Sequence, residues 1–290
     1  MSDPNSNSPQ EIPPPLPYIE PLPVEQPSMW RRALKPLGII GILLLKFYTK
    51  VKFFILPAIK FLPLIAKTGL TMVLSIGVYA MFWGWKFALG FVVLIFIHEM
   101  GHVLAARWVN LKVSAPVFIP FIGAHILMKE MPPNARIEAI VGIGGPILGT
   151  AGAMACQVIH TWTGDPMWMA LAYSGYFLNL FNLIPLTPLD GGRICAALSP
   201  WLWLPGLALL VGMMIQRGSV NVVLILILFA AVPKVWSLFK AKSEAEKRYY
   251  EVALPHRIVI ALLYFSLAGL LYFQKEEAIL ALQEANHWGY

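Results

Sequence analysis

The chain has 290 residues, of which 58% are hydrophobic and only 13% are charged. A typical soluble domain is about a quarter charged, so this chain has too few charges to coat a soluble globule of its size. The balance excludes a cytosolic monomer and favours a multi-spanning membrane protein, with disorder confined to local segments. The net charge of +7 includes no basic cluster on a polar domain, so we expect no nucleic-acid partner.

The chain opens with a proline-rich segment. Residues 1–28 contain nine prolines and four acidic residues but no Lys or Arg, which predicts a disordered tail over 1–29. Residues 30–67 are apolar but dotted with lysines, and Pro57 and Pro63 interrupt them. This pattern favours basic amphipathic helices on the membrane surface. A short extra span, which would begin near residue 37, is the alternative.

From Thr68 onward, apolar runs close to the length that a bilayer requires follow one another. The predicted spans are 68–85, 87–108, 137–160, 167–186, 201–216, 219–236 and 255–273. The predicted fold class is therefore an all-α multi-pass membrane protein with about six to seven transmembrane helices. By this count the lysine-rich regions 46–67 and 234–257 share one side of the membrane. The positive-inside rule makes that side cytoplasmic.

The segment between the second and third spans differs from its neighbours. Residues 112–135 are rich in β-branched and aromatic side chains and are broken by Pro116, Pro120 and Gly123. We expect a small membrane-associated β hairpin here, covered by protein or by a watery cavity. His125 falls in this segment. It is either a side chain that lines the substrate path or an additional metal ligand.

The second span carries the motif H-E-x-x-H as His98, Glu99 and His102. On a helix, residues four positions apart share a face, so both imidazoles can reach one zinc ion. The glutamate between them is then placed to act as the general base toward a bound water. Ionisable groups inside a span are costly and indicate function. The alternative, a helix end where polar residues meet water, does not explain why all three share one helical surface.

A hydrolytic zinc site requires a third protein ligand and one open position. The two cysteines form no metal-binding pair, and the extended metzincin motif is absent because residue 108 is Trp. Asp190 follows the fourth span, on the predicted side of His102, and Pro185 and Pro188 interrupt the helix before it. By itself the pattern leaves two interpretations, a metal ligand or a turn residue at a helix N-terminus.

The chain resembles the site-2 protease family of intramembrane zinc metalloproteases, in its compact type without a PDZ domain. His98 to His102 match the first motif of that family, and Asn182-x-x-Pro185 with Leu189-Asp190-Gly191 matches the second. The resemblance implies zinc held by His98, His102 and Asp190, with Glu99 as catalytic acid/base and Asn182 at the substrate or oxyanion. It implies a zinc protease core over 68–198, with accessory transmembrane helices over 199–290.

The expected activity is hydrolysis of peptide bonds in or near transmembrane segments, that is, regulated intramembrane proteolysis. The expected partners are the lipid bilayer and a single-span membrane protein substrate, and the expected location is a bacterial cell membrane. Two alternatives remain at this point. One is a catalytically inactive zinc-binding scaffold or chaperone, and the other is a metal-dependent transporter. The sequence does not predict the oligomeric state.

Overall fold

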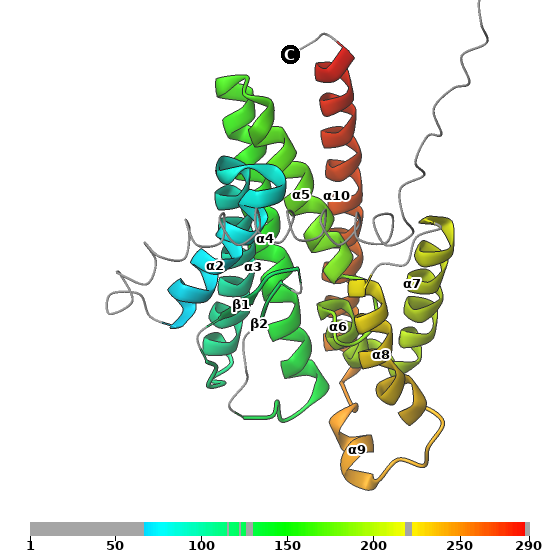
Figure 1. Ribbon diagram of the computed structural model, residues 1–290. Helices are drawn as coiled ribbons and strands as arrows, with labels where there is room; N and C mark the ends of the chain where they lie inside the picture. The colour runs from blue at the N-terminus through cyan, green and yellow to red at the C-terminus, as the bar shows by residue number, and fades with distance from the viewer. Residues whose placement is uncertain (1–66, 115, 122, 126–129, 218–221, 288–290) are drawn as a thin grey trace, which may run out of the picture. The chain divides into compact units, whose positions relative to one another are not determined.

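The computed structural model describes residues 67–114, 116–121, 123–125, 130–217 and 222–287, so the predicted tail and surface helices before residue 67 lie outside it. The described part is helical apart from one two-stranded antiparallel hairpin, and the predicted fold class is confirmed (Figure 1). The elements in chain order are α2 (Lys67–Trp83), α3 (Trp85–Trp108), β1 (Val117–Ile119), β2 (Gly123–His125), α4 (Ala135–Thr163), α5 (Pro166–Asn182), α6 (Asp190–Leu198), η1 (Pro200–Leu202), α7 (Trp203–Arg217), α8 (Val222–Ser237), α9 (Glu244–Tyr249) and α10 (Leu254–His287).

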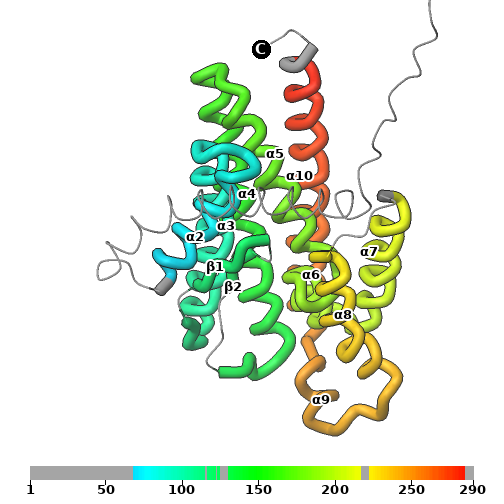
Figure 2. Tube along the Cα trace, in the orientation of Figure 1, coloured from blue at the N-terminus to red at the C-terminus, as the bar shows by residue number. Residues whose placement is uncertain are grey.

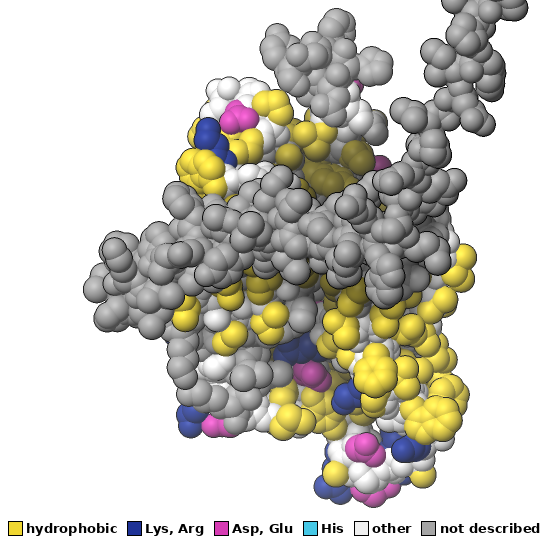
Figure 3. Space-filling view, in the orientation of Figure 1, with side chains coloured by type: hydrophobic (Ala, Val, Ile, Leu, Met, Phe, Trp, Pro, Cys, Tyr) yellow, Lys and Arg dark blue, Asp and Glu magenta, His cyan; other side chains and the backbone are white. Residues whose placement is uncertain are grey.

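Three of the described helices, α3, α4 and α10, are long and apolar enough to cross a membrane. Shorter apolar helices lie at 68–83, 200–216 and 222–237. Many large hydrophobic side chains on these helices are exposed on the protein surface, as expected for helices in contact with lipid and not with water. In Figure 3 the charged side chains gather at the end that carries α9, while hydrophobic side chains cover α7 and α8. The protein is therefore an integral membrane protein.

Local signals in the sequence set the ends of the two helices that follow the hairpin. The Asn134 side chain caps α4. At its other end α4 stops at Gly164, which has the left-handed backbone (φ 69°) that favours glycine. The next residue, Asp165, caps α5 by accepting a hydrogen bond of 2.9 Å from the Met167 backbone N–H. These caps turn the chain sharply, so that α4 and α5 pack against each other.

Helix α4 is the centre of the bundle, because it packs against α3, α5, α6 and α10 (Figure 2). Its contact with α3 depends on two glycines that face each other. A Cβ at Gly101 would collide with the backbone of Gly144, and a Cβ at Gly144 would lie 2.5 Å from the Gly101 carbonyl oxygen. Only glycine permits so close an approach of the two backbones. The approach matters for function because Gly101 lies within the H-E-x-x-H motif.

The predicted hairpin after α3 is confirmed, with Phe118 opposite Ala124 in its register. It packs on α2 and α3. The Phe118 backbone N–H donates to the Thr71 hydroxyl on α2 (3.1 Å), and its ring stacks on Phe96 of α3 at 6.3 Å between centroids. The outer edge of β1 is thus directed at α2. In an antiparallel pair, two residues that lie opposite each other direct their backbone N–H and C=O groups either both inward or both outward. Because the Phe118 N–H points outward, its partner Ala124 also directs its N–H and C=O outward, to the free edge of β2.

Candidate metal centre

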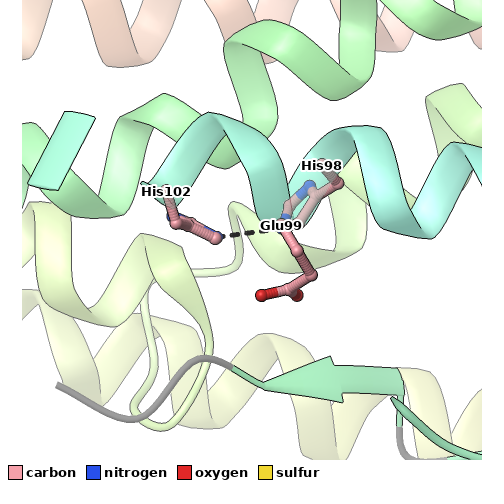
Figure 4. A group of neighbouring side chains, drawn as sticks. All are labelled: His98, Glu99 and His102. Atoms are coloured by element: carbon pink, nitrogen blue, oxygen red, sulfur yellow. Dashed lines mark hydrogen bonds between the residues drawn. The ribbon is translucent and has the colours of Figure 1, made fainter. Parts of the chain in front are cut away.

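Helix α3 presents His98, Glu99 and His102 from one helical surface, and all three are buried, with 3–6% of their surface exposed. Figure 4 shows the His102 imidazole turned toward His98. The two Nε2 atoms lie 3.1 Å apart. The predicted pairing of residues four apart on a helix is therefore present in the structure.

Asp190 joins this pair from α6, at the N-terminus of that helix. Its Oδ2 lies 3.2 Å from Nε2 of His98 and 3.2 Å from Nε2 of His102. The turn before α6 is held from two sides. The Tyr264 hydroxyl of α10 donates to the Leu183 carbonyl (2.6 Å), and Gly191 lies so close to that carbonyl that a Cβ would collide with it. Gly191, next to Asp190, thus lets α6 start close against the backbone of the turn at Leu183.

The three donor atoms form a nearly equilateral triangle with edges of 3.1, 3.2 and 3.2 Å. A tetrahedral ion with bonds of about 2.1 Å separates neighbouring ligand atoms by about 3.4 Å. The observed edges are within a few tenths of an ångström of that value. Two imidazoles with one carboxylate, leaving a fourth position open, is also a donor set that hydrolytic zinc uses. The residues present therefore fit a zinc ion.

Each of the two imidazoles has a second contact that fixes its orientation. His102 Nδ1 lies 2.8 Å from the Val141 carbonyl, and His98 Nδ1 lies 2.7 Å from Oδ1 of Asn179. A carbonyl can only accept, so His102 carries its proton on Nδ1. The Asn179 amide nitrogen donates to the Gly175 carbonyl (2.7 Å), which leaves its oxygen to accept from His98. Both imidazoles consequently present an unprotonated Nε2 toward the triangle, as metal-binding histidines require.

The carboxylate of Asp190 continues into a charged network outside the triangle. Arg193 lies 3.8 Å from Oδ1 of Asp190 and 3.6 Å from Oε1 of Glu138 on α4. The Tyr249 hydroxyl of α9 donates to Oε2 of the same Glu138 (2.6 Å). This network connects the third donor to the polar segment between α8 and α10.

Glu99 lies beside the donor triangle without being part of it. A carboxylate oxygen of Glu99 lies within 4.8 Å of the imidazole nitrogens of His98 and His102. Glu99 is buried, with 6% of its surface exposed. A carboxylate at this distance can exchange a proton with a small molecule that occupies the open position.

Two other predicted residues have less definite positions. Asn182 is the last residue of α5 and is partly buried, one turn beyond Asn179. Its role at the substrate or oxyanion stays a prediction. The backbone of His125 lies in β2, but its side chain is outside the described residues. The residue that the sequence analysis missed is Asn179. The available signal was an amide side chain inside an apolar span.

Parts of the sequence are similar to known proteins. Residues 86–164, which include nearly all of α3 and the whole of α4, match the sequence model of peptidase family M50. The resemblance to the site-2 protease family is confirmed. The chain is also 31% identical over 130 residues to a zinc metalloprotease of Methanocaldococcus jannaschii. That similarity covers 43% of this chain and 37% of the relative, so the chain spans little more than a third of the relative's length.

The M50 match ends before the second motif. It contains His98, Glu99 and His102, but neither Asn182 nor Asp190. The comparison therefore supports a metalloprotease motif on α3, while the association of Asp190 with that motif rests on the distances in the structure.

Proposed function

We propose that the protein is an intramembrane zinc metalloendopeptidase, which hydrolyses peptide bonds in or near the transmembrane segments of other proteins. The observation that carries the proposal is the convergence of three donor atoms beside a buried glutamate, inside a bundle of apolar helices. The M50 match and the named zinc metalloprotease relative support the same class of enzyme.

Nε2 of His98, Nε2 of His102 and Oδ2 of Asp190 would hold the zinc ion. When bound, zinc polarises the scissile carbonyl and lowers the pKa of water toward about 7. Glu99 accepts the proton of the attacking water and later delivers it to the amine that leaves. Asn182, at the end of α5, binds the substrate or donates to the oxyanion that develops on the carbonyl. Asn179 and Val141 keep the two imidazoles in the required orientation.

A helical substrate must unwind before cleavage, because its carbonyls are hidden in its own hydrogen bonds. The hairpin can stabilise the unwound strand by edge addition. The edge of β1 faces α2 through the Phe118 N–H, so the substrate strand pairs with β2 along Ala124. The hairpin also packs against α3 next to the motif, through Phe96. We therefore expect the paired strand to lie near the part of α3 that carries the motif.

The two alternative functions are less well supported. A scaffold that only binds zinc has no need of a buried carboxylate such as Glu99 beside the metal ligands. A transporter built on inverted repeats would carry a second, related half. In the described ranges, one cluster of three or more potential ligands is found, and it is the one on α3.

The direct test is cleavage of a single-span reporter protein by wild type and by Glu99→Gln, together with zinc analysis of both purified proteins. We expect the variant to keep its zinc and to lose about 10²- to 10⁴-fold of the cleavage rate, because general acid–base catalysis contributes that much. Equal cleavage by both proteins, or none by the wild type, would contradict the proposal. Loss of zinc from Glu99→Gln would show that the residue acts as a ligand.

The role of the hairpin has its own test. Proline at Ala124 removes the N–H that points to the outer edge of β2 but leaves the ladder to β1 intact. We expect Ala124→Pro to slow cleavage with zinc content unchanged, whereas the control Ala124→Gly keeps the N–H, adds no atoms to this buried position and keeps the rate. Unchanged cleavage by Ala124→Pro would show that the substrate does not pair with β2. It would leave the proposed roles of the metal-binding residues unaffected.

The proposal also covers the class of substrate and the membrane in which the protein lies. A single-span regulatory membrane protein is the proposed substrate, and a bacterial cell membrane with the basic loops in the cytoplasm is the proposed location. The supporting observation is that the lysines and arginines of 234–257 lie from the last turn of α8, through the polar helix α9, to the first turn of α10. Tagging the loop that contains α9 and testing its access to a membrane-impermeant reagent would check the orientation.

A further inference from the structure

A groove of about 580 Å³ lies among α3, α4 and α10, and neither Glu99 nor any of the three metal-binding side chains lines it. Most of its lining is aliphatic, and Leu104, Ile140, Ile147 and Leu263 are among the lining side chains. Its floor includes Gly101 and Gly144, which form the close contact between α3 and α4. The proposed chemistry uses none of these side chains, so the groove needs a separate explanation.

The polar side chains of the groove are gathered at one end. Trp108 is the last residue of α3, Arg136 is the second residue of α4 and His256 is the third residue of α10. These three helix ends carry the lining residues nearest the membrane boundary, and every lining residue farther along the helices is apolar. Trp108 is 79% exposed, as expected for an aromatic anchor at the headgroup level.

The length of the groove corresponds to one leaflet of a bilayer. On α4 the lining residues run from Arg136 to Leu148, which are twelve residues apart, a rise of about 18 Å. Half of a hydrocarbon core of about 30 Å is about 15 Å. The groove therefore reaches from the headgroup level to about the middle of the membrane.

Arg136 supplies a positive charge at the open end. Its side chain is exposed, and within the described ranges no carboxylate forms an ion pair with it. The nearest acidic residue along α4, Glu138, is engaged by Arg193 and Tyr249. His256, half-buried at the same end, can donate a further hydrogen bond. Basic pockets between transmembrane helices are suited to the headgroups of anionic lipids.

We propose that this groove is a binding site for an anionic phospholipid, with its phosphate at Arg136 and His256 and one acyl chain along α4. The test uses the full chain in detergent micelles, titrated with phosphatidylglycerol or phosphatidylcholine and followed by native mass spectrometry. Phosphatidylglycerol binds more tightly, and Arg136→Gln weakens its binding about fivefold, the equivalent of about 1 kcal/mol for one basic residue. The control Arg107→Gln, an exposed cation on the last turn of α3 outside the groove, leaves binding unchanged.

A second pair of variants tests the apolar part of the site. Leu263 lines the groove and is 48% exposed, while the adjacent Leu262 is 63% exposed and outside it. We expect Leu263→Trp to fill the groove and lose the bound lipid, and Leu262→Trp to retain it. Because lipid and not cleavage is measured, the result does not depend on the proposed protease activity.

Three outcomes would overturn the lipid site. These are equal binding of the two lipids to wild type, unchanged binding to Arg136→Gln, and full retention of phosphatidylglycerol by Leu263→Trp. A hydrophobic peptide that binds wild type, fails to bind Leu263→Trp and leaves the lipid count unchanged would assign the groove to a protein segment instead. Equal thermal unfolding midpoints of the two Trp variants exclude misfolding as the cause of any loss.

Discussion

Helices α4 and α10 are alike in sequence character but different in what surrounds them. Their most apolar windows have mean hydropathies of 1.6 and 1.7, and both are long enough to cross a membrane. Half of the α4 window is buried inside the protein, against 17% of the α10 window. Hydropathy therefore shows that a helix can lie in a bilayer, but it does not show which helix is the centre of the bundle.

The small residues distinguish the two helices. In α4, Gly144, Gly145 and Gly149 each lie where a Cβ would collide with α3 or α5. In α10, Gly269 has open space around it. Close packing through small residues is the usual way for helices to associate in lipid, where no hydrophobic force draws them together. The metal-binding face of α3 is thus held by a helix contact that α10 lacks.

Matched glycine substitutions in the two helices give the largest expected contrast. Gly144→Ala places a methyl group 2.5 Å from the Gly101 carbonyl oxygen and forces α3 away from α4. We expect a loss of about 1–3 kcal/mol in the free energy of unfolding, as in other overpacked cores, together with weaker zinc binding. Gly269→Ala adds its methyl group to open space and is expected to be neutral or to gain up to about 1 kcal/mol.

Unfolding of the two purified variants in detergent, followed by helical circular dichroism and zinc content, measures this contrast. Equal losses of stability and zinc in the two variants would show that the α3–α4 contact tolerates an added methyl group as well as the exposed surface of α10 does. That result would break the distinction drawn between the two helices.

The next effect concerns two asparagines one turn apart on α5. Asn179→Ala removes the acceptor for His98 Nδ1, so we expect about a 10- to 100-fold loss of zinc affinity, the range for partners that orient metal ligands. Asn182→Ala is expected to keep the zinc affinity and to lower the cleavage rate. Competition with a zinc chelator measures the affinities. The reverse pattern would assign the metal-orienting role to Asn182.

The smallest effect lies at the α9 end of the charged network. Tyr249→Phe removes the hydrogen bond to Glu138 and should cost about 1 kcal/mol. Burial raises the pKa of the Tyr249 hydroxyl, and the bond to Glu138 raises it further. The stabilisation is therefore present below the unfolded pKa of about 10 and is lost only as the pH rises through the higher folded value. The unfolding midpoint of the wild type should exceed that of Tyr249→Phe by the same amount at pH 6 and at pH 8.5. A difference that shrinks over this range would contradict the hydrogen bond from Tyr249 to Glu138 as its cause.

Local patterns in the sequence predicted much of this arrangement. The i, i+4 spacing placed His98 and His102 on one face of α3, and the β-branched run with Pro and Gly predicted the hairpin. Both depend on short-range geometry, which the chain sets wherever it folds. The span predictions likewise matched the helices to within a few residues, apart from the fourth and the last. Helix α5 ends at Asn182 and not at 186, and α10 continues to His287, well beyond the predicted end at 273.

Contacts between distant segments were not predictable in the same way. The sequence left Asp190 open between a ligand and a turn residue, and the α3–α4–α6 packing brings its Oδ2 to the two imidazoles. Asn179 meets a histidine 81 positions earlier because Gly149 of α4 leaves room for its amide. No periodicity within α5 indicates which polar side chain faces that gap. The predicted domain boundaries stay predictions.

The central claim is that α3 and α6 together hold one zinc ion through two imidazoles and one carboxylate. X-ray absorption at the zinc edge of the purified protein tests it most directly. The account predicts one zinc per chain, with two nitrogen ligands at about 2.0–2.1 Å showing imidazole scattering, oxygen ligands at about 2.0–2.2 Å, and loss of one oxygen ligand in Asp190→Ala. A spectrum with sulfur ligands, a single imidazole, or no change in Asp190→Ala would contradict it.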